Sequence, residues 1–427
     1  MPMLPDGARA TPVDLFDDAP DPPLPVYSAA LAADECAPWL RLMLTEGIGP
    51  VAALRLLARF GLPDRLFPAD GGNGAGIDTR ALRAELGPTL AATLLKPDER
   101  RDTLVRRCVE WADPSASPPR HLLALVDPRY PRRLLDLHDP PLVLFVLGNP
   151  ACLARPSIAI VGSRQASRAG LMHAETFARS LSRRGWTIAS GLAAGIDTAA
   201  HRGALAELAA SAEEPSPQQA VRDKTAPRGA RTRRSLHLDA DDGRAREPGA
   251  TFAVVGNGLD LVYPAANRAL ADRIATHGAV VGELPLGTPP LPAHFPRRNR
   301  LIAALSVGVI VVEAAQRSGS LITARLAAEL GRDVFALPGS IDAPLARGCH
   351  TLIKQGAKLV DTLDDVLDEL LPLDGAAAAA PSTPAPSTPA PSTPAPSTPA
   401  PPTPAPPTPT PPTPTPPTPT PPTPTPP

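Results

Sequence analysis

The chain has 427 residues, enough for two or three domains and a large buried core. Its 42 basic and 43 acidic residues leave a formal net charge of −1, so overall charge gives no argument for nucleic-acid binding. Four cysteines lie far apart without a C-x-x-C pair, which argues against a disulfide framework or a zinc knuckle. Because no signal-like N-terminus or apolar run of about 18 residues is present, we expect a cytoplasmic protein with no membrane partner.

The N-terminal part is predicted to be helical after a short disordered start. Residues 1–25 are rich in Pro and Asp and indicate disorder, whereas residues 26–112 carry helical periodicity with little strand signal. Two short helices are expected on either side of a glycine hairpin, Gly47-Ile48-Gly49-Pro50. Residues 121–148 then predict a strand, a Pro-rich turn region and a second strand.

Residues 113–372 are predicted to form one domain, a doubly wound α/β fold with a mostly parallel sheet. Short apolar runs alternate there with longer amphipathic runs, the pattern of a parallel sheet covered by helices. The expected strands are 157–161, 187–190, 251–255, 279–283, 307–313, 333–337 and 357–360. The expected helices are about 169–184, 196–208, 267–277, 299–305, 319–330 and 362–371, with Asn267 as an N-cap and Gly278 after the helix end.

Two further segments have the composition of disordered chain. Residues 209–249 are polar and rich in Pro and Arg, and we expect a disordered insertion. Its basic stretch 222–234 is conceivable as a DNA contact, but a solvated loop is the favoured interpretation. Residues 373–427 end in five-residue Pro/Thr/Ala repeats, which predict an extended polyproline II spacer. A repeat without a specific binding partner is the favoured interpretation, and a segment that docks on a partner is the alternative.

Ligands of parallel α/β sheets bind where strands lead into helices, because helix N-termini there attract phosphate. The first such loop holds Gly162, Ser163 and Arg164, which suit a phosphate through backbone N–H groups and a bidentate guanidinium. The second holds Ser190 and Gly191 before a helix that carries Asp197 and His201. Two interpretations of Asp197 and His201 are open: they cap and pack the helix, or they form an acid/base or metal-binding pair. Packing is favoured for His201.

Three later loops carry further candidates. Tyr263 follows a two-glycine turn and either stacks on a base or packs the loop. The densest basic cluster of the folded part suits a single nucleic-acid strand, because an aromatic ring can stack on bases while arginines meet the backbone. It comprises Phe295, Arg297, Arg298, Asn299 and Arg300. Another helix N-terminus suited to phosphate follows the most apolar strand, at Ser318, Gly319 and Ser320.

Common enzyme signatures are missing from the sequence. It contains no G-x-x-x-x-G-K-[ST], H-E-x-x-H or G-x-S-x-G motif, and no G-x-G-x-x-G follows the expected strands. We therefore expect a binding protein with no catalytic residues, no cofactor and no metal.

Seven ordered motifs resemble the DNA-processing protein A (DprA, or Smf) family. They run from about residue 122 to 360 and include GSR (162–164), SGLAAGIDTAAHRGAL (190–205) and GELPLGTPPLPAHFPRRNRLIAALS (282–306). The resemblance implies an extended Rossmann-like domain that binds and protects single-stranded DNA and loads the RecA recombinase during natural transformation. It also implies a homodimer and no established enzyme activity.

Carried onto this chain, the family's DNA pocket is expected at Ser163, Arg164 and residues 295–300, with Lys354 as an addition. The Gly47–Gly49 hairpin resembles the helix-hairpin-helix or SAM-like domain of the family, whose backbone N–H groups could meet phosphates. The chain departs from the family in its long insertion and in the repeat tail that replaces a winged helix. An alternative is a nucleotide-processing enzyme of the Rossmann-like phosphoribohydrolase class, but SGSLIT replaces the PGGxGT motif of those enzymes.

Overall fold

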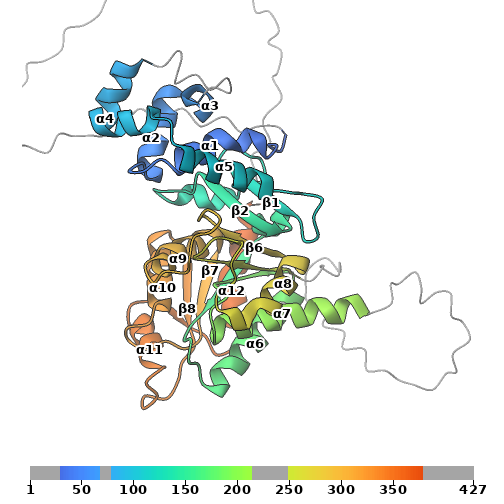
Figure 1. Cartoon of the computed structure of the whole chain (residues 1–427). Coiled ribbons are helices and arrows are strands. Elements are labelled where there is room, and N and C mark those ends of the chain that lie inside the picture. Colours follow the sequence, from blue (N-terminus) through green and yellow to red (C-terminus); the bar gives the residue numbers. More distant parts are fainter. Residues whose placement is uncertain (1–28, 68–77, 214–248, 378–427) are drawn as a thin grey trace, which may run out of the picture. The chain divides into compact units, whose positions relative to one another are not determined.

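A computed structural model describes residues 29–67, 78–213 and 249–377 of the chain (Figure 1). All of them belong to one compact unit, Met1–Ala377, and a second unit, Ala378–Pro427, lies outside the described residues. The predictions of disorder for residues 1–25, for most of the insertion and for the repeat tail therefore stay predictions. None of the helices in the described residues is long and apolar enough to cross a membrane.

The N-terminal part is helical, as the periodicity predicted, and the two helices around the glycine hairpin are confirmed. Side chains fix where its two longest helices begin: Asp78 accepts from the Arg80 and Ala81 N–H groups, and Asp98 accepts from those of Arg100 and Arg101. The elements are η1 (Asp34–Cys36), α1 (Ala37–Met43), α2 (Pro50–Phe60), α3 (Pro63–Leu66), α4 (Thr79–Leu95) and α5 (Glu99–Trp111).

A nine-stranded sheet follows, in the order β1-β2-β6-β5-β4-β3-β7-β8-β9. The pairs β1–β2 and β2–β6 are antiparallel and every other neighbouring pair is parallel, so the predicted mostly parallel α/β fold is confirmed. The strands are β1 (Arg120–Ala124), β2 (Val143–Gly148), β3 (Ser157–Val161), β4 (Thr187–Ser190), β5 (Thr251–Val254), β6 (Ala279–Gly282), β7 (Gly308–Val311), β8 (Asp333–Ala336) and β9 (Lys358–Leu359).

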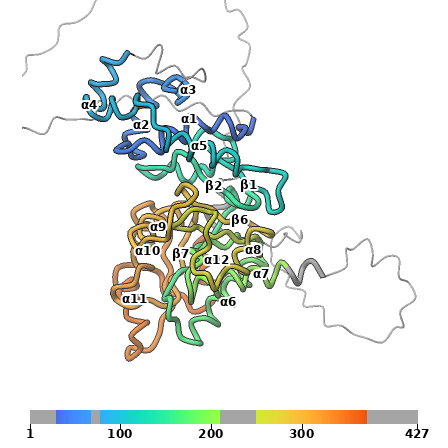
Figure 2. The backbone as a smooth tube through the Cα atoms, in the orientation of Figure 1, coloured from blue at the N-terminus to red at the C-terminus, as the bar shows by residue number. Residues whose placement is uncertain are grey.

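Helices cover both faces of this sheet, as the backbone trace in Figure 2 shows. Along β3, Ile158 and Ile160 pack in one buried cluster with α6 and α12, whereas Ala159 and Val161 pack in the other with α9 and α10. This alternation is the two-residue period of a strand that is buried on both faces. The helices are α6 (Arg168–Arg183), α7 (Ile196–Glu213), α8 (Arg268–His277), α9 (His294–Leu305), α10 (Ser320–Glu329), α11 (Arg347–Lys354) and α12 (Asp364–Ala377), with the 3-10 turns η2 (Arg132–Asp136), η3 (Pro150–Leu153) and η4 (Ala265–Asn267).

Several helix boundaries differ from the prediction. α9 begins at His294, five residues earlier than expected, because Pro296 falls in the first helical turn, where its missing N–H has no intrahelical partner to lose. α7 continues to Glu213, so the predicted insertion begins within a helix. α12 likewise continues beyond residue 372, the predicted end of the domain, and α11 was not predicted at all.

Helix α8 begins and ends where the sequence predicted, but Asn267 and Gly278 do not act as the expected helix caps. Asn267 occupies the N-cap position, but its amide donates to Leu192 O at 2.8 Å and to Thr198 Oγ1 at 2.9 Å instead of capping the helix. Gly278 ends the helix in an extended conformation, not a left-handed one. A Cβ atom at Gly278 would lie 1.9 Å from Thr251 O, so close packing on β5 explains this glycine.

Candidate nucleic-acid interface

The sheet changes winding direction at β3. Its neighbours are β4, which follows it in the chain, and β7, which is reached only after three more strands, so the loops that leave β3 and β7 diverge from adjacent carboxyl ends. Such a switch point is where doubly wound sheets hold ligands. The predicted candidates 162–164 and 318–320 lie on these two loops.

Two loops and the first turn of α9 contribute the side chains of an aromatic stack, by which we mean Arg164, Tyr263 and Phe295. The guanidinium carbon of Arg164 lies 5.2 Å from the centroid of the Phe295 ring, within cation–π distance. The Tyr263 ring centroid lies 5.5 Å from that of Phe295, with the planes tilted by 35°. Arg164 is exposed and Tyr263 is 43% exposed, so a cation and an aromatic ring are both open to a ligand.

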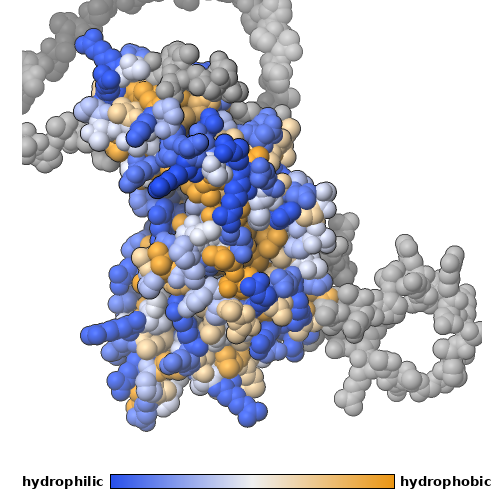
Figure 3. Space-filling view, viewed as in Figure 1, coloured by the Kyte–Doolittle hydropathy of each residue, from blue (hydrophilic) through white to orange (hydrophobic). Residues whose placement is uncertain are grey.

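Exposed apolar side chains also lie on the loops that follow β5 and β6. Leu261 is 40% exposed and Leu291 is 48% exposed, and the Gly258 N–H donates to Thr288 O at 3.0 Å, which ties the two loops together. Figure 3 shows hydrophobic residues interrupting the hydrophilic surface of the face that it draws. Exposed apolar groups beside a cation suit a ligand with flat rings and negative charge.

A serine-glycine-serine loop adjoins α9. The amide of Asn299 donates to Gly319 O at 3.2 Å, and the hydroxyls of Ser318 and Ser320 lie 2.7 Å apart. α10 begins at Ser320, but the N–H groups of Ser318, Leu321 and Ile322 already donate to Ala315 O, Ser318 O and Gly319 O. The Asn299 amide thus joins α9 to this loop.

Arg298 does not face solvent, so the prediction that it contacts DNA directly is wrong. It is only 5% exposed, and its Nη1 donates to Val254 O at 2.5 Å. Burial lowers its pKa to about 10, although the charge of buried Asp197 acts in the opposite direction. A Cβ atom at Gly191 would lie 2.0 Å from Arg298 Nη1, so this glycine makes room for the guanidinium and does not approach a phosphate.

Arg300 is also buried, so the prediction that it contacts DNA is wrong for the same reason. The residue is 7% exposed, and its guanidinium pairs with Glu283 and places Nε 3.5 Å from Asp139 Oδ2. Arg297 belongs to the same cluster, with Nε 3.3 Å from Glu283 Oε1, but 51% of its side chain is exposed. Of the three predicted arginines on α9, Arg297 alone keeps a guanidinium open to solvent.

Other predicted residues support the loops from beneath. Ser190 is fully buried and donates its hydroxyl to Ile160 O at 2.7 Å, so it is unavailable to a ligand. Asp197 accepts from the Gly191 and Ala193 N–H groups, which makes it a loop anchor, and burial raises its pKa. The Ser163 N–H donates to Glu313 O at 2.7 Å, while the Ser163 hydroxyl accepts from the Gln165 N–H.

Lys354 lies away from this edge. Because β8 and β9 are parallel, the intervening α11 returns from the carboxyl edge of the sheet to its amino edge. Lys354 is the last residue of α11 and is exposed near the amino edge. The structure does not bring it to Arg164.

A carboxylate already occupies the N-terminus of α6. Glu313 Oε2 accepts from the Ser167 N–H at 2.8 Å, and Glu313 Oε1 accepts from the Ser167 hydroxyl at 2.5 Å. A Cβ atom at Gly170 would lie 2.5 Å from the Glu313 carboxyl carbon, so the first turn of α6 closes around this group. The anion position after β3 is therefore filled by the protein itself.

His201 is a core residue of this region. It is fully buried, and because the Thr251 hydroxyl donates its single proton to Ile188 O, His201 Nδ1 is the donor to Thr251 Oγ1 at 2.8 Å. Burial lowers the pKa of His201 to about 3, with a smaller contribution from Arg298. The favoured packing interpretation agrees with these contacts. No three His, Cys, Asp or Glu side chains gather as metal ligands within residues 29–67, 78–213 and 249–377.

The low pKa predicts a loss of stability in acid. The unfolded chain binds a proton at His201 below about pH 6.5, whereas the folded chain stays neutral until about pH 3, so stability falls as pH drops through this window. From pH 7.5 to 4.5 the expected contribution lost is about 2–3 kcal/mol. Urea unfolding at both pH values should show this loss in the wild type and not in His201→Asn, which keeps a donor for Thr251 but has no titrating ring. Equal losses in both proteins would contradict the assignment.

Two exposed arginines at the same edge were not predicted. Arg317 lies in the loop between β7 and α10, and Arg347 is the first residue of α11. The Gly348 N–H donates to Ala314 O at 2.8 Å, so the start of α11 lies against the loop after β7. Tyr263 was noted only as a loop aromatic, and its exposure beside Phe295 was not foreseen. The available signal was position, since all three follow strands of the parallel sheet.

Comparisons with known proteins agree with this architecture. Residues 121–213 and 240–371 match the family described as DNA recombination-mediator protein A. The DNA processing protein DprA of Streptococcus pneumoniae is 42% identical over 246 residues, which are 58% of this chain and 73% of that protein. Protein Smf of Escherichia coli is 41% identical over 254 residues, 59% of this chain and 57% of that protein. The X-ray structure of the S. pneumoniae DprA aligns with a TM-score of 0.57 at 33% identity, covering 80% of this chain and 98% of that one.

Proposed function

Because the chain belongs to the DNA recombination-mediator protein A family, we propose that it binds single-stranded DNA at the carboxyl edge of its sheet and presents the strand to a RecA recombinase. The observation that carries the proposal is the aromatic stack, in which exposed Arg164 lies over Phe295 and beside half-exposed Tyr263. Stacking on aromatic rings with cations on the backbone is how proteins bind a single strand without reading its sequence.

In this proposal the phosphates and the bases meet different residues. Arg164 and Arg297 offer guanidinium groups to phosphates, and the loop before α10 adds the half-buried hydroxyl of Ser318. Bases stack on the exposed part of the Tyr263 ring, next to Leu261 and Leu291. Duplex DNA hides its base faces, so the stack favours single strands.

Buried Arg298 and Arg300 have positioning roles in this proposal. Arg298 joins α9 to the end of β5 through Val254 O, and Arg300 joins α9 to Glu283 after β6. Both contacts fix the first turn of α9, which carries Phe295. Their substitution should therefore disturb the stack indirectly.

Nucleotide hydrolysis receives no support from the geometry. The helix N-terminus after β3, where a nucleotide phosphate would sit in many Rossmann-like proteins, holds the Glu313 carboxylate. Buried Asp197 is engaged by two backbone N–H groups, and His201 by Thr251. We therefore propose no catalytic residue.

The partners in this proposal are RecA and a second copy of the chain. The family description as a recombination mediator supports the role with RecA. Analytical ultracentrifugation of the 44.3 kDa chain tests the homodimer, and RecA assembly on a strand coated with a single-strand-binding protein, with and without this chain, tests the loading step.

Salt dependence is the first test of the proposed interface. Because phosphate neutralisation releases counterions, affinity for a 30-nucleotide strand should fall by about 0.7 decades per decade of salt for each phosphate contacted. With three or four contacts, the expected slope is about −2 to −3 in fluorescence anisotropy titrations. The corresponding duplex should bind more weakly at every salt concentration. A slope near zero would refute the proposed contacts with phosphates. Tighter binding of the duplex would refute the proposed stacking of bases on the aromatic rings.

A further inference from the structure

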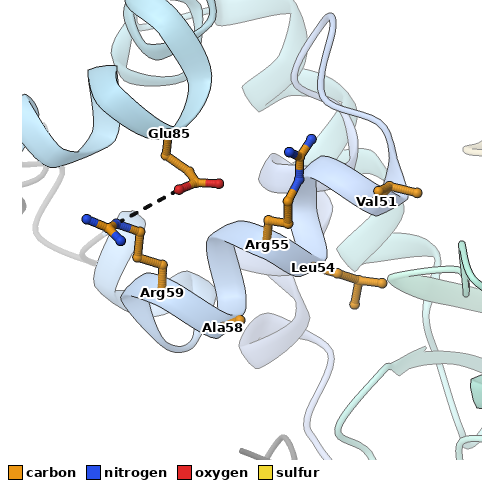
Figure 4. A pocket seen from close by; sticks show the side chains of 6 residues that line it. All are labelled: Val51, Leu54, Arg55, Ala58, Arg59 and Glu85. Atoms are coloured by element: carbon orange, nitrogen blue, oxygen red, sulfur yellow. Dashed lines mark ion pairs between the residues drawn. The ribbon is translucent and has the colours of Figure 1, made fainter. Parts of the chain in front are cut away.

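A groove on the helical part lies outside the proposed DNA interface. It has a volume of about 420 Å³ and is lined by residues of α2 and α4, which are Val51, Leu54, Arg55, Ala58, Arg59 and Glu85 (Figure 4). We call it the α2–α4 groove. We propose that residues 13–18 of this chain, Val-Asp-Leu-Phe-Asp-Asp, dock in it.

The groove combines an apolar side with positive charge. Val51 is 43% exposed, Leu54 is half-buried and Ala58 is exposed, and these three lie at helical spacing along one side of α2. Arg55 and Arg59 project from the same helix near Glu85, as Figure 4 shows. An exposed apolar strip bordered by arginines fits a peptide that carries both apolar side chains and carboxylates.

The positive charge of the groove is only partly neutralised. Arg59 Nε lies 3.9 Å from Glu85 Oε2, a long contact between partly exposed groups. Arg55 is exposed and has no ion-pair partner among the residues that the structure describes. The groove also begins in the first turn of α2, where the helix dipole favours negative charge.

The sequence outside the described residues offers one well-matched occupant. Residues 1–28 carry five aspartates against one arginine, and three of the aspartates flank Leu15 and Phe16. Residues 68–77 hold a single aspartate among glycines, and residues 378–427 hold no charged side chain. Residues 214–248 contain eight basic against six acidic residues, so arginines in the groove oppose them.

The length of chain permits this contact within one molecule. Ten residues, 19–28, link the acidic segment to position 29, where the described chain begins, and they span up to about 36 Å when extended. The 11-residue α2 is only about 16 Å long. A tether of this length also gives the segment a millimolar effective concentration, so a weak docking affinity suffices.

Disulfide trapping in the full chain tests the proposal. The four native cysteines are all buried, so two introduced thiols can be followed without interference. Ala19→Cys places a thiol directly after the acidic segment, and Ala58→Cys places its partner in the groove. The matched control pairs Ala19→Cys with Ala32→Cys, an exposed alanine that lies closer along the chain and would react faster if the tether were undirected.

We expect the groove pair to form its disulfide about tenfold faster than the control pair under mild oxidant. The rate should return to the control rate when Asp14, Asp17 and Asp18 are replaced together by asparagine, or with Arg55→Glu. Val51→Cys provides a second groove position if Ala58→Cys folds poorly by circular dichroism. A control pair that reacts as fast as the groove pair, or a groove rate that the asparagine variant leaves unchanged, would overturn the proposal.

Discussion

Arg164→Ala is expected to weaken binding of a 30-nucleotide single strand about tenfold to a hundredfold, because it removes a cation that lies over the Phe295 ring at the proposed interface. The side chain is exposed and makes no buried ion pair among the described residues, so the fold should be unaffected. Fluorescence anisotropy at fixed ionic strength measures the loss, and thermal unfolding verifies that the domain is intact.

Two further variants separate charge from stacking in this prediction. Arg164→Lys keeps the charge but lacks the planar guanidinium, so an intermediate loss is expected. Arg179→Ala removes the same charge from the middle of α6, where Arg179 Nη2 lies 3.1 Å from Glu175 Oε1 and the side chain is not part of the stack. This substitution should have little effect on DNA binding. If Arg164→Ala and Arg179→Ala bind the strand equally well, the aromatic stack is not the DNA site.

Glu283→Ala is expected to destabilise the protein by about 3–5 kcal/mol, because it breaks a buried ion pair and leaves a charged partner behind. Glu283 is 8% exposed and forms an ion pair with Arg300. The Nε and Nη1 atoms of Arg300 already lack hydrogen-bond partners among the described residues. Asp139 would then be the acidic partner left to Arg300 among the described residues, with 3.5 Å between Oδ2 and Nε. Urea unfolding at pH 7 measures the change in the free energy of unfolding.

Arg297→Ala is the matched control for this second prediction. Arg297 contacts the same carboxylate at 3.3 Å, but half of its side chain is exposed, so its removal should cost less than about 1 kcal/mol. The two variants should also differ in DNA binding, since Arg297 faces solvent and is proposed to meet phosphate. Equal destabilisation by both substitutions would show that the Glu283–Arg300 pair does not carry the stability of this cluster.

Much of the fold was accessible from local pattern. The run Ser157–Val161 is apolar after its first residue and is bounded by a proline and a glycine, which identifies a strand buried on both faces. The alternation of such runs with amphipathic stretches predicted the parallel sheet, whose strand-to-helix loops carry Ser163, Arg164 and residues 318–320. Helix α9 was predicted too short because its first turn contains Pro296.

The sequence by itself determined the α/β class, the helical N-terminal part and the positions of the strand-to-helix loops, because hydrophobic period and glycine placement act over a few residues. It did not determine which cations face solvent. The sequence gives no means of telling Arg297, Arg298 and Arg300 apart, because all three are arginines in one short segment. The packing of α9 against β5 and β6 buries two of them and leaves one exposed. The stacking of Tyr263 on Phe295 and the return of α11 that carries Lys354 away were likewise decided by tertiary structure, since contacts between distant loops depend on strand order.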